Sequence, residues 1–117
     1  ILITSDVPIV VYAHCYGSAS SGATMLLPTS SYGYEYYSLN TSQVYASDCF
    51  SWFYVVANEN NTRVEITPSA ATRGGRNANV PFQVTLNRGQ IFQVLGAIQS
   101  GSTGFDLTGS RVRSVPN

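Results

Sequence analysis

The pattern of apolar and polar residues predicts short β-strands along the chain, and the most apolar stretch is Phe50–Ala57. This stretch is rich in aromatic and β-branched residues, contains no Gly or Pro, and is shorter than an ordinary core helix. Those features predict a strand buried on both faces. The next stretch, Thr62–Thr67, alternates apolar and polar residues, which is typical of a strand with one face in solvent. Asn58–Asn61 suits a tight turn, so we expect a hairpin at the centre of a sheet.

The remaining pattern predicts further short strands, separated by Gly, Pro and Asn. The expected strands are Ile1–Ser5, Pro8–His14, Ala23–Leu27, Tyr34–Leu39, Pro81–Leu86, Gln90–Leu95, Phe105–Thr108 and Ser110–Ser114. Asn87–Gly89 is expected to close a second hairpin, whereas Ser69–Val80 is expected to be irregular. No segment has the 3.6-residue period and the caps of a helix. The sequence therefore predicts an all-β fold, an antiparallel β-sandwich or jelly-roll-like structure.

Composition limits the size of the protein and the partners that it can bind. With 117 residues, the chain is expected to form one domain, residues 1–117. Charged residues make up only 10%, and the six basic residues, all Arg, are balanced by six acids. Nucleic acid and anionic membrane surfaces are therefore poor partners, because binding them needs clustered cations. No apolar run approaches the ~20 residues of a membrane span.

Several features of the composition favour an extracellular protein. The chain combines low charge with many Ser and Thr residues, eight Tyr and two Cys. Because it starts at Ile1 without an initiator Met, we expect a processed product or one unit of a longer or repeated chain.

The sequence contains no recognisable catalytic or metal-binding pattern. His14 and Cys15 are adjacent on an expected strand, so their side chains project to opposite faces and cannot form a nucleophile–base pair. Two Cys, one His and scattered acids also lack the close spacing of zinc ligands. The Ser-rich loops contain neither a nucleophile elbow nor a phosphate-binding pattern. We therefore predict a non-enzymatic protein without catalytic, cofactor-binding or metal-binding residues.

Two kinds of covalent feature fit an extracellular setting. Cys15 and Cys49 are expected to form a disulfide, worth roughly 4 kcal/mol in the loop-entropy model. The alternative is two free buried thiols in a reducing compartment. Asn40-Thr41-Ser42 and Asn60-Asn61-Thr62 are N-glycosylation sequons in expected turns or strand ends. We therefore expect N-linked glycans at Asn40 and Asn60 if the source is a eukaryote.

Tyrosines and arginines supply the candidate binding residues. Tyr32, Tyr34, Tyr36 and Tyr37 are expected to form a binding face, because Tyr gives rigid amphipathic contact area. The alternative is a cross-strand aromatic ladder within one sheet. Arg73 and Arg76 flank two glycines and could hold an anion, although exposed Arg residues in a loop are usually solvated.

Several phrases of the sequence occur together in a specific order and cover almost the whole chain. They are Ile3–Ala13, Leu26–Ser30 leading to Gly33–Tyr37, Phe53–Ala57 with Asn61–Thr67, and Asp106–Val112. In this order they resemble the N-terminal domain family of IgGFc-binding protein. The resemblance implies a secreted, β-rich module of large extracellular proteins, associated in animals with mucus and with binding antibody Fc. It implies no catalytic residues.

The two ends of the chain suggest how such modules assemble. Val112–Pro116 echoes Ile3–Pro8, so the chain is expected to be either a unit of a tandem array or a subunit of a fibre. In a fibre, a terminal strand of one copy completes the sheet of the next. Ile1, Leu2 and Ile3 would suit such a donated strand, the alternative being an ordinary edge strand.

The predicted function is thus that of a structural or adhesive module. We expect it to bind copies of itself or extracellular glycoproteins. The alternative function is recognition of an Fc-like protein or a carbohydrate, through the Tyr32–Tyr37 face or the Ser69–Val80 loop.

Overall fold

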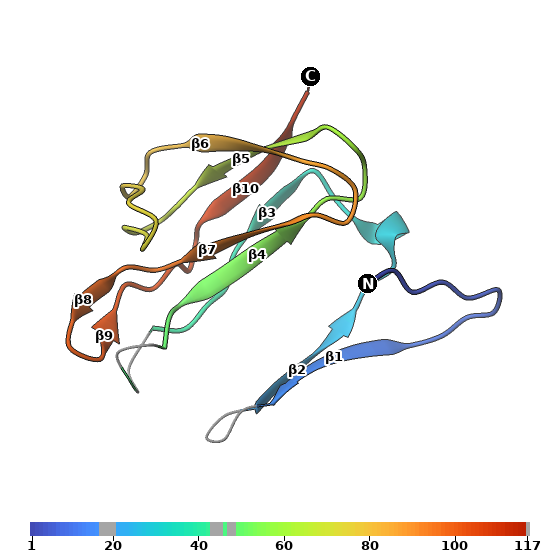
Figure 1. The fold of residues 1–117 in the computed structure, drawn as a ribbon, viewed down its shortest axis with the longest axis horizontal. Helices are drawn as coiled ribbons and strands as arrows, with labels where there is room; N and C mark the ends of the chain where they lie inside the picture. The colour runs from blue at the N-terminus through green and yellow to red at the C-terminus, as the bar shows by residue number, and fades with distance from the viewer. Residues whose placement is uncertain (17–20, 43–45, 47–48, 117) are drawn as a thin grey trace. The chain divides into compact units, whose positions relative to one another are not determined.

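The computed structural model describes residues 1–16, 21–42, 46 and 49–116. This part of the chain contains ten β-strands, a single 3-10 turn and no α-helix (Figure 1). All strand pairs are antiparallel, so the all-β prediction is confirmed. The chain divides into two compact units, Ile1–Gly33 and Tyr34–Asn117.

The first unit is a two-stranded hairpin with no buried side chain among its described residues. It contains β1 (Val11–Tyr16) and β2 (Ser21–Leu26), followed by the 3-10 turn η1 (Thr29–Ser31). Residues before Val11 form no strand, so the strand expected at Ile1–Ser5 is wrong and the next one begins later than expected. Two strands alone bury too little apolar surface to be stable in water.

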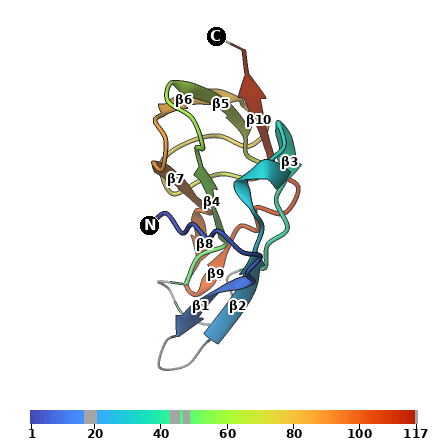
Figure 2. The same cartoon turned by 90° about the vertical axis from the view of Figure 1, so that its right-hand side faces the viewer.

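The second unit is built of two sheets and a small hairpin. The first sheet has the order β3 (Glu35–Tyr37), β10 (Arg111–Val115), β5 (Thr62–Thr67), β6 (Phe82–Leu86). The second sheet consists of β4 (Trp52–Val56) and β7 (Ile91–Leu95). Beyond β7, β8 (Ile98–Ser100) and β9 (Thr103–Gly104) form the hairpin. Figure 2 shows the strands of this unit after a turn of 90°.

The core lies between the two sheets. The first sheet contributes Val64, Ile66, Leu86 and Val112, the second contributes Val94, and connecting segments contribute Ala57 and Leu107. Half-buried side chains of both sheets pack against this cluster, including the tilted ring pair Phe82–Phe92 at 6.0 Å. Inner faces that interdigitate in this way define a β-sandwich, as the sequence predicted.

The two expected hairpins are wrong. Although β4 and β5 are consecutive in the chain, β4 pairs with β7, and β5 pairs with β10 and β6. The strands β6 and β7 are likewise in different sheets. Both connections therefore cross from one sheet to the other, which lets the apolar faces of successive strands meet in the core. Side-chain oxygens join the two crossings: the Asn61 N–H donates to Asn87 Oδ1 at 3.0 Å, and the Arg88 N–H donates to Asn60 Oδ1 at 3.1 Å.

Two further expectations differ from the structure. Strand β4 is buried on one face only: Phe53 and Val55 point to the core, whereas Trp52, Tyr54 and Val56 are exposed. Their exposure follows because no strand among the described residues of the second unit covers the outer face of the β4–β7 sheet. The segment expected as a strand at Phe105–Thr108 instead leads into a hydrogen-bonded turn.

Gly96, at the end of β7, has no space for a side chain. A Cβ at this position would lie 2.4 Å from the carbonyl oxygen of Phe105. We expect Gly96→Ala to lower the free energy of unfolding by about 1–3 kcal/mol, because the clash is with backbone. Gly74→Ala is the matched control, since its Cβ would meet nothing closer than 3.9 Å. Denaturant unfolding measures both variants, and equal stability would contradict the close approach.

Candidate functional site

The most prominent candidate site is one side of strand β4. At the two ends of the strand, the Gly96 N–H donates to the Ser51 carbonyl at 2.8 Å, and the Ala57 N–H donates to the Gln90 carbonyl at 3.2 Å. Residues of an antiparallel strand point their N–H and C=O groups alternately to either side. The backbone groups of Trp52, Tyr54 and Val56 therefore point away from β7. We call this row of backbone groups the β4 edge.

One end of the β4 edge is covered by a side chain. The amide nitrogen of Asn40 donates a hydrogen bond to the carbonyl oxygen of Trp52. Asn40 is itself fixed by Thr108, whose Oγ1 accepts the Asn40 N–H at 3.0 Å. Along the rest of the edge, at Tyr54 and Val56, no strand of the described chain pairs with β4.

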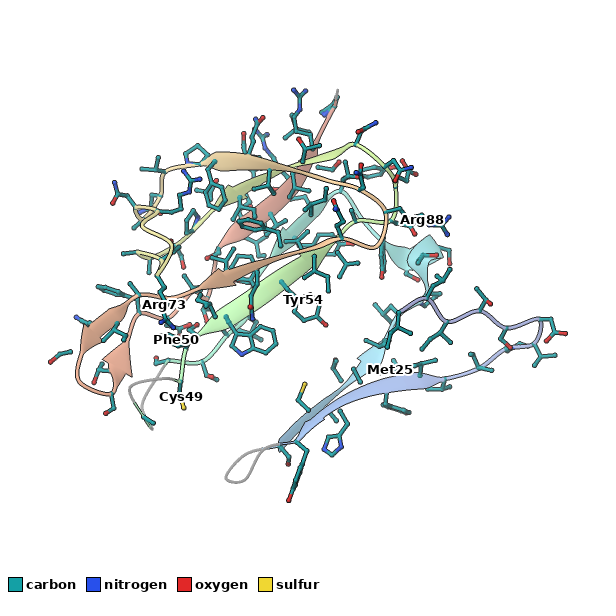
Figure 3. The ribbon with its side chains drawn as sticks, viewed as in Figure 1. Met25, Cys49, Phe50, Tyr54, Arg73 and Arg88 are labelled. Atoms are coloured by element: carbon teal, nitrogen blue, oxygen red, sulfur yellow. The ribbon has the colours of Figure 1, made fainter. Side chains whose placement is uncertain are left out.

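Apolar side chains flank the β4 edge on both faces of the sheet. On the outer face, the rings of Trp52 and Tyr54 are nearly parallel at 5.7 Å, and the residues are 44% and 46% exposed (Figure 3). On the inner face, Phe53 and Val55 are half-buried and pack against the core. A strand added at this edge would therefore meet apolar side chains on both of its faces.

An open depression lies where β4 begins. It is lined by Leu39, Asn40, Thr41, Phe50, Ser51 and Trp52. The lining combines apolar side chains with one amide and two hydroxyl groups. None of these six described residues has an ionisable side chain, and they supply packing surface and hydrogen-bonding groups.

The turn at Asp106–Ser110 holds the segment that carries Asn40. Oδ1 of Asp106 accepts hydrogen bonds from the Thr108 N–H at 2.9 Å and from Thr108 Oγ1 at 2.8 Å. These bonds, with a weaker one from Ser51, keep the pKa of Asp106 below its ordinary value. Ser110 Oγ and Ser38 Oγ both donate to the Leu107 carbonyl at 2.7 Å. The turn is thus a structural clamp between distant segments.

The outer face of the first sheet is polar and internally paired. Arg111 contacts Glu35 at 2.5 Å, and Arg113 contacts Glu65 at 2.7 Å. The hydrogen bond from each Arg lowers the pKa of its carboxylate partner. On the same face, Arg63 donates to the Pro116 carbonyl. Four of the charges on this face are therefore paired with one another, in contrast to the uncharged β4 edge.

The two loop arginines lie on aromatic rings. The guanidinium of Arg73 is 4.6 Å from the ring centre of Phe50, and that of Arg76 is 4.7 Å from the ring centre of Phe82. Figure 3 shows Arg73 beside Phe50. Cation–π contacts of this kind fix the Ser69–Val80 loop to the sandwich, while anion binding by these residues stays a prediction.

Comparison with known proteins gives one match. The family model described as IgGFc binding protein matches residues 22–117, which include most of β2 and the entire second unit. The chain belongs to the IgGFc-binding protein family. This membership confirms the resemblance found in the sequence and indicates an extracellular module of a binding or adhesive type. No curated protein and no solved structure matches the chain.

In this IgGFc-binding family chain, the four predicted tyrosines are distributed over both units. Tyr32 belongs to the first unit, and Tyr34, Tyr36 and Tyr37 belong to the second. Alternation along β3 places Tyr37 on the polar face, where its hydroxyl lies 3.3 Å from Glu35, and Tyr36 on the opposite face. All four are exposed, and their role in binding stays a prediction.

The remaining predicted residues are also distributed over both units. Cys15 is exposed, Cys49 is half-buried, and both are free. They lie in different units, and their disulfide stays a prediction. His14 and Cys15 are neighbours on β1, opposite Ala23 and Gly22. Among the described residues, no group of three His, Cys, Asp or Glu side chains gathers to hold a metal, and no helix has the length and apolar character needed to cross a membrane.

The two sequons differ in their surroundings. Asn40 is half-buried and its amide nitrogen, the atom that would carry a glycan, is bonded to Trp52. Asn60 is exposed, and its Oδ1 accepts the Arg88 N–H. After secretion from a eukaryotic cell, we expect a glycan at Asn60 and none at Asn40. Intact mass of Asn60→Gln should show loss of one glycan, while the control Asn40→Gln keeps it; the reverse pattern would contradict the geometry.

Two features of the site, the β4 edge and the Asp106–Ser110 clamp, were not predicted from the sequence. The β4 edge was missed because β4 was expected in a hairpin with β5. The clamp was missed because Asp106–Thr108 was expected in a strand. A signal for the clamp was present, since Asp followed two residues later by Thr and then by Gly is typical of a side-chain-bonded turn.

Proposed function

We propose that this chain is a non-enzymatic, secreted module that assembles with copies of itself through the edges of β-strands. Its neutral polar surfaces would carry an N-linked glycan at Asn60 and contact extracellular glycoproteins. The observation that supports this proposal is the β4 edge, which no strand covers at Tyr54 and Val56 in the described chain. An uncovered edge is a template for a strand from another molecule.

A second feature supports strand exchange. Natural edge strands are commonly protected by charged residues or Pro. Strand β4 has neither, since its sequence is Trp-Phe-Tyr-Val-Val. At the same time Ile1, Leu2 and Ile3 are exposed and belong to no strand. Their structure does not support the alternative of an ordinary edge strand within the domain.

The proposal is tested by the size of the purified chain in solution. We expect oligomers or filaments by light scattering after gel filtration and by negative-stain microscopy. Replacing Ile1, Leu2 and Ile3 together with Ser should remove them, whereas the control Thr4→Ala should not. A monomeric chain at all attainable concentrations would contradict the proposal.

Recognition of an Fc-like protein or a carbohydrate is the second candidate. It is favoured by the 82% exposure of Tyr34 and by membership of the family. In this case the chain would be monomeric and would bind immobilised antibody Fc or a glycan array. Tyr34→Ala would then weaken binding, and Tyr34→Phe, which keeps the ring, would weaken it less. Oligomers without such binding would argue against this candidate.

A further inference from the structure

We propose that β4 is the acceptor strand of the assembly, and that Ile1–Ser5 of a second copy pairs with it at Tyr54 and Val56. This inference rests on the proposed function, because it names the partner segment and the register of the acceptor site.

The alternating direction of the backbone groups along β4 limits which residues can bond to an incoming strand. The N–H and C=O groups of Tyr54 and Val56 point away from β7, as the hydrogen bonds at Ser51 and Ala57 establish. The Trp52 carbonyl already accepts the Asn40 amide. The incoming strand therefore pairs from Tyr54 toward Val56, and Asn40 marks the end of the site.

The opposite edge of the same sheet, along β7, is also covered at one end. The Leu95 carbonyl of β7 accepts the Arg73 N–H at 2.9 Å, and the neighbouring Ala97 N–H donates to the Ala71 carbonyl at 2.9 Å. The segment that precedes the Arg73 turn thus lies along the end of β7. On the side away from β4, Ile91 and Gln93 of β7 have no strand partner in the described chain, as is true of Tyr54 and Val56 on the side of β4 away from β7. The side chains distinguish the two edges, because β7 carries the polar Gln93 opposite Tyr54, whereas every residue of β4 is apolar or aromatic.

The side chains around the β4 edge favour an incoming strand with apolar residues. An added strand would place alternate side chains next to Trp52, Tyr54 and Val56 on the outer face, and the others on the inner face. A strand that is buried on both faces has a continuous run of apolar residues. Ile1-Leu2-Ile3 is such a run, it is exposed, and neither it nor β4 carries a charged side chain.

The geometry also predicts the form of the assembly. Each copy has one donor segment and one acceptor edge, which are different surfaces. Contacts between unlike surfaces propagate from copy to copy and produce rings or open filaments. Because a single added strand buries less area than a standard interface, the assembly should depend strongly on protein concentration.

A proline at Val56 tests the acceptor. Because the Val56 N–H points away from β7, Val56→Pro removes a donor that the β4–β7 ladder does not use, and Pro is tolerated on edge strands. We expect the apparent dissociation constant of assembly to rise at least about tenfold, the equivalent of one hydrogen bond. Val56→Ala, which keeps the N–H, should assemble like the unchanged chain.

Mixing two assembly-deficient variants provides a second measurement. The Val56→Pro variant keeps the donor segment Ile1–Ser5, and the triple Ser variant at Ile1–Ile3 keeps the acceptor strand β4. Each alone should be monomeric, and an equimolar mixture should form a one-to-one heterodimer that does not grow further. If Val56→Pro loses cooperative unfolding, Tyr54→Lys replaces it, because a Lys on the edge opposes pairing; Tyr54→Gln is its neutral control.

The outcomes separate the inference from the proposed function. Folded Val56→Pro that assembles as well as Val56→Ala would overturn β4 as the acceptor and leave self-assembly through another edge intact. A monomeric unchanged chain would overturn both. In that monomer, slow hydrogen exchange of the Tyr54 and Val56 amides would show that a strand of the same chain pairs with the β4 edge. The edge would then not be open to a second copy.

Discussion

Replacing Ile66 with Ala is expected to lower the free energy of unfolding by about 2–5 kcal/mol, the usual cost of a large cavity in a core. Ile66 is fully buried in β5 and lies opposite Val112 on one side and Phe82 on the other. The side chain therefore joins three strands of the first sheet and faces the second sheet. Its loss leaves a cavity that rigid neighbouring strands cannot close.

The matched control for this prediction is Ile91→Ala. The same chemical change occurs there in β7, but the side chain is 61% exposed, so we expect a loss below about 1 kcal/mol. Denaturant unfolding followed by Trp52 fluorescence measures both variants. Equal losses at the two positions would show that the core does not lie between the two sheets as described.

Replacing Ser110 with Ala is expected to cost about 1–3 kcal/mol, the penalty for leaving buried polar groups without partners. Ser110 is completely buried, and its hydroxyl donates to the Leu107 carbonyl at 2.7 Å. The same oxygen accepts the Ser69 N–H at 3.0 Å. The substitution leaves the Ser69 N–H in the interior with no acceptor there, and it loosens the clamp that positions β10.

Ser114→Ala is the control, because Ser114 is exposed at the other end of β10. We expect its unfolding free energy to stay within about 0.5 kcal/mol of the unchanged chain. If Ser110→Ala were as stable as Ser114→Ala, the turn would be a loop without a structural role. The turn would then not be what holds Asn40 against Trp52.

Much of this protein could be predicted from local pattern. Alternation at Thr62–Thr67 predicted that Val64 and Ile66 point inward and that Arg63 and Glu65 point outward, and the structure agrees. The positive φ of 78° at Gly89 also fits the predicted turn. Such features depend on neighbours in sequence, because side chains alternate along any strand whatever its partner.

The pairing of the strands could not be predicted from local pattern. Asn58–Asn61 and Asn87–Gly89 have the composition of hairpin turns, but both connect strands of different sheets. A turn signal says that the chain reverses direction, and it does not say whether the next strand lies beside or above the previous one. That choice depends on which apolar faces can be buried together.

The sequence by itself determined the all-β class, the family, the inward residues of most strands and the neutral character of the surface, because composition and period-two alternation are local properties of the chain. Tertiary structure alone decided that β4 pairs only with β7 in the described chain, that Asn40 covers one end of it, and that Tyr54 and Val56 present their backbone groups outward. Those facts depend on contacts between residues distant in sequence, which alternation along a single strand cannot specify.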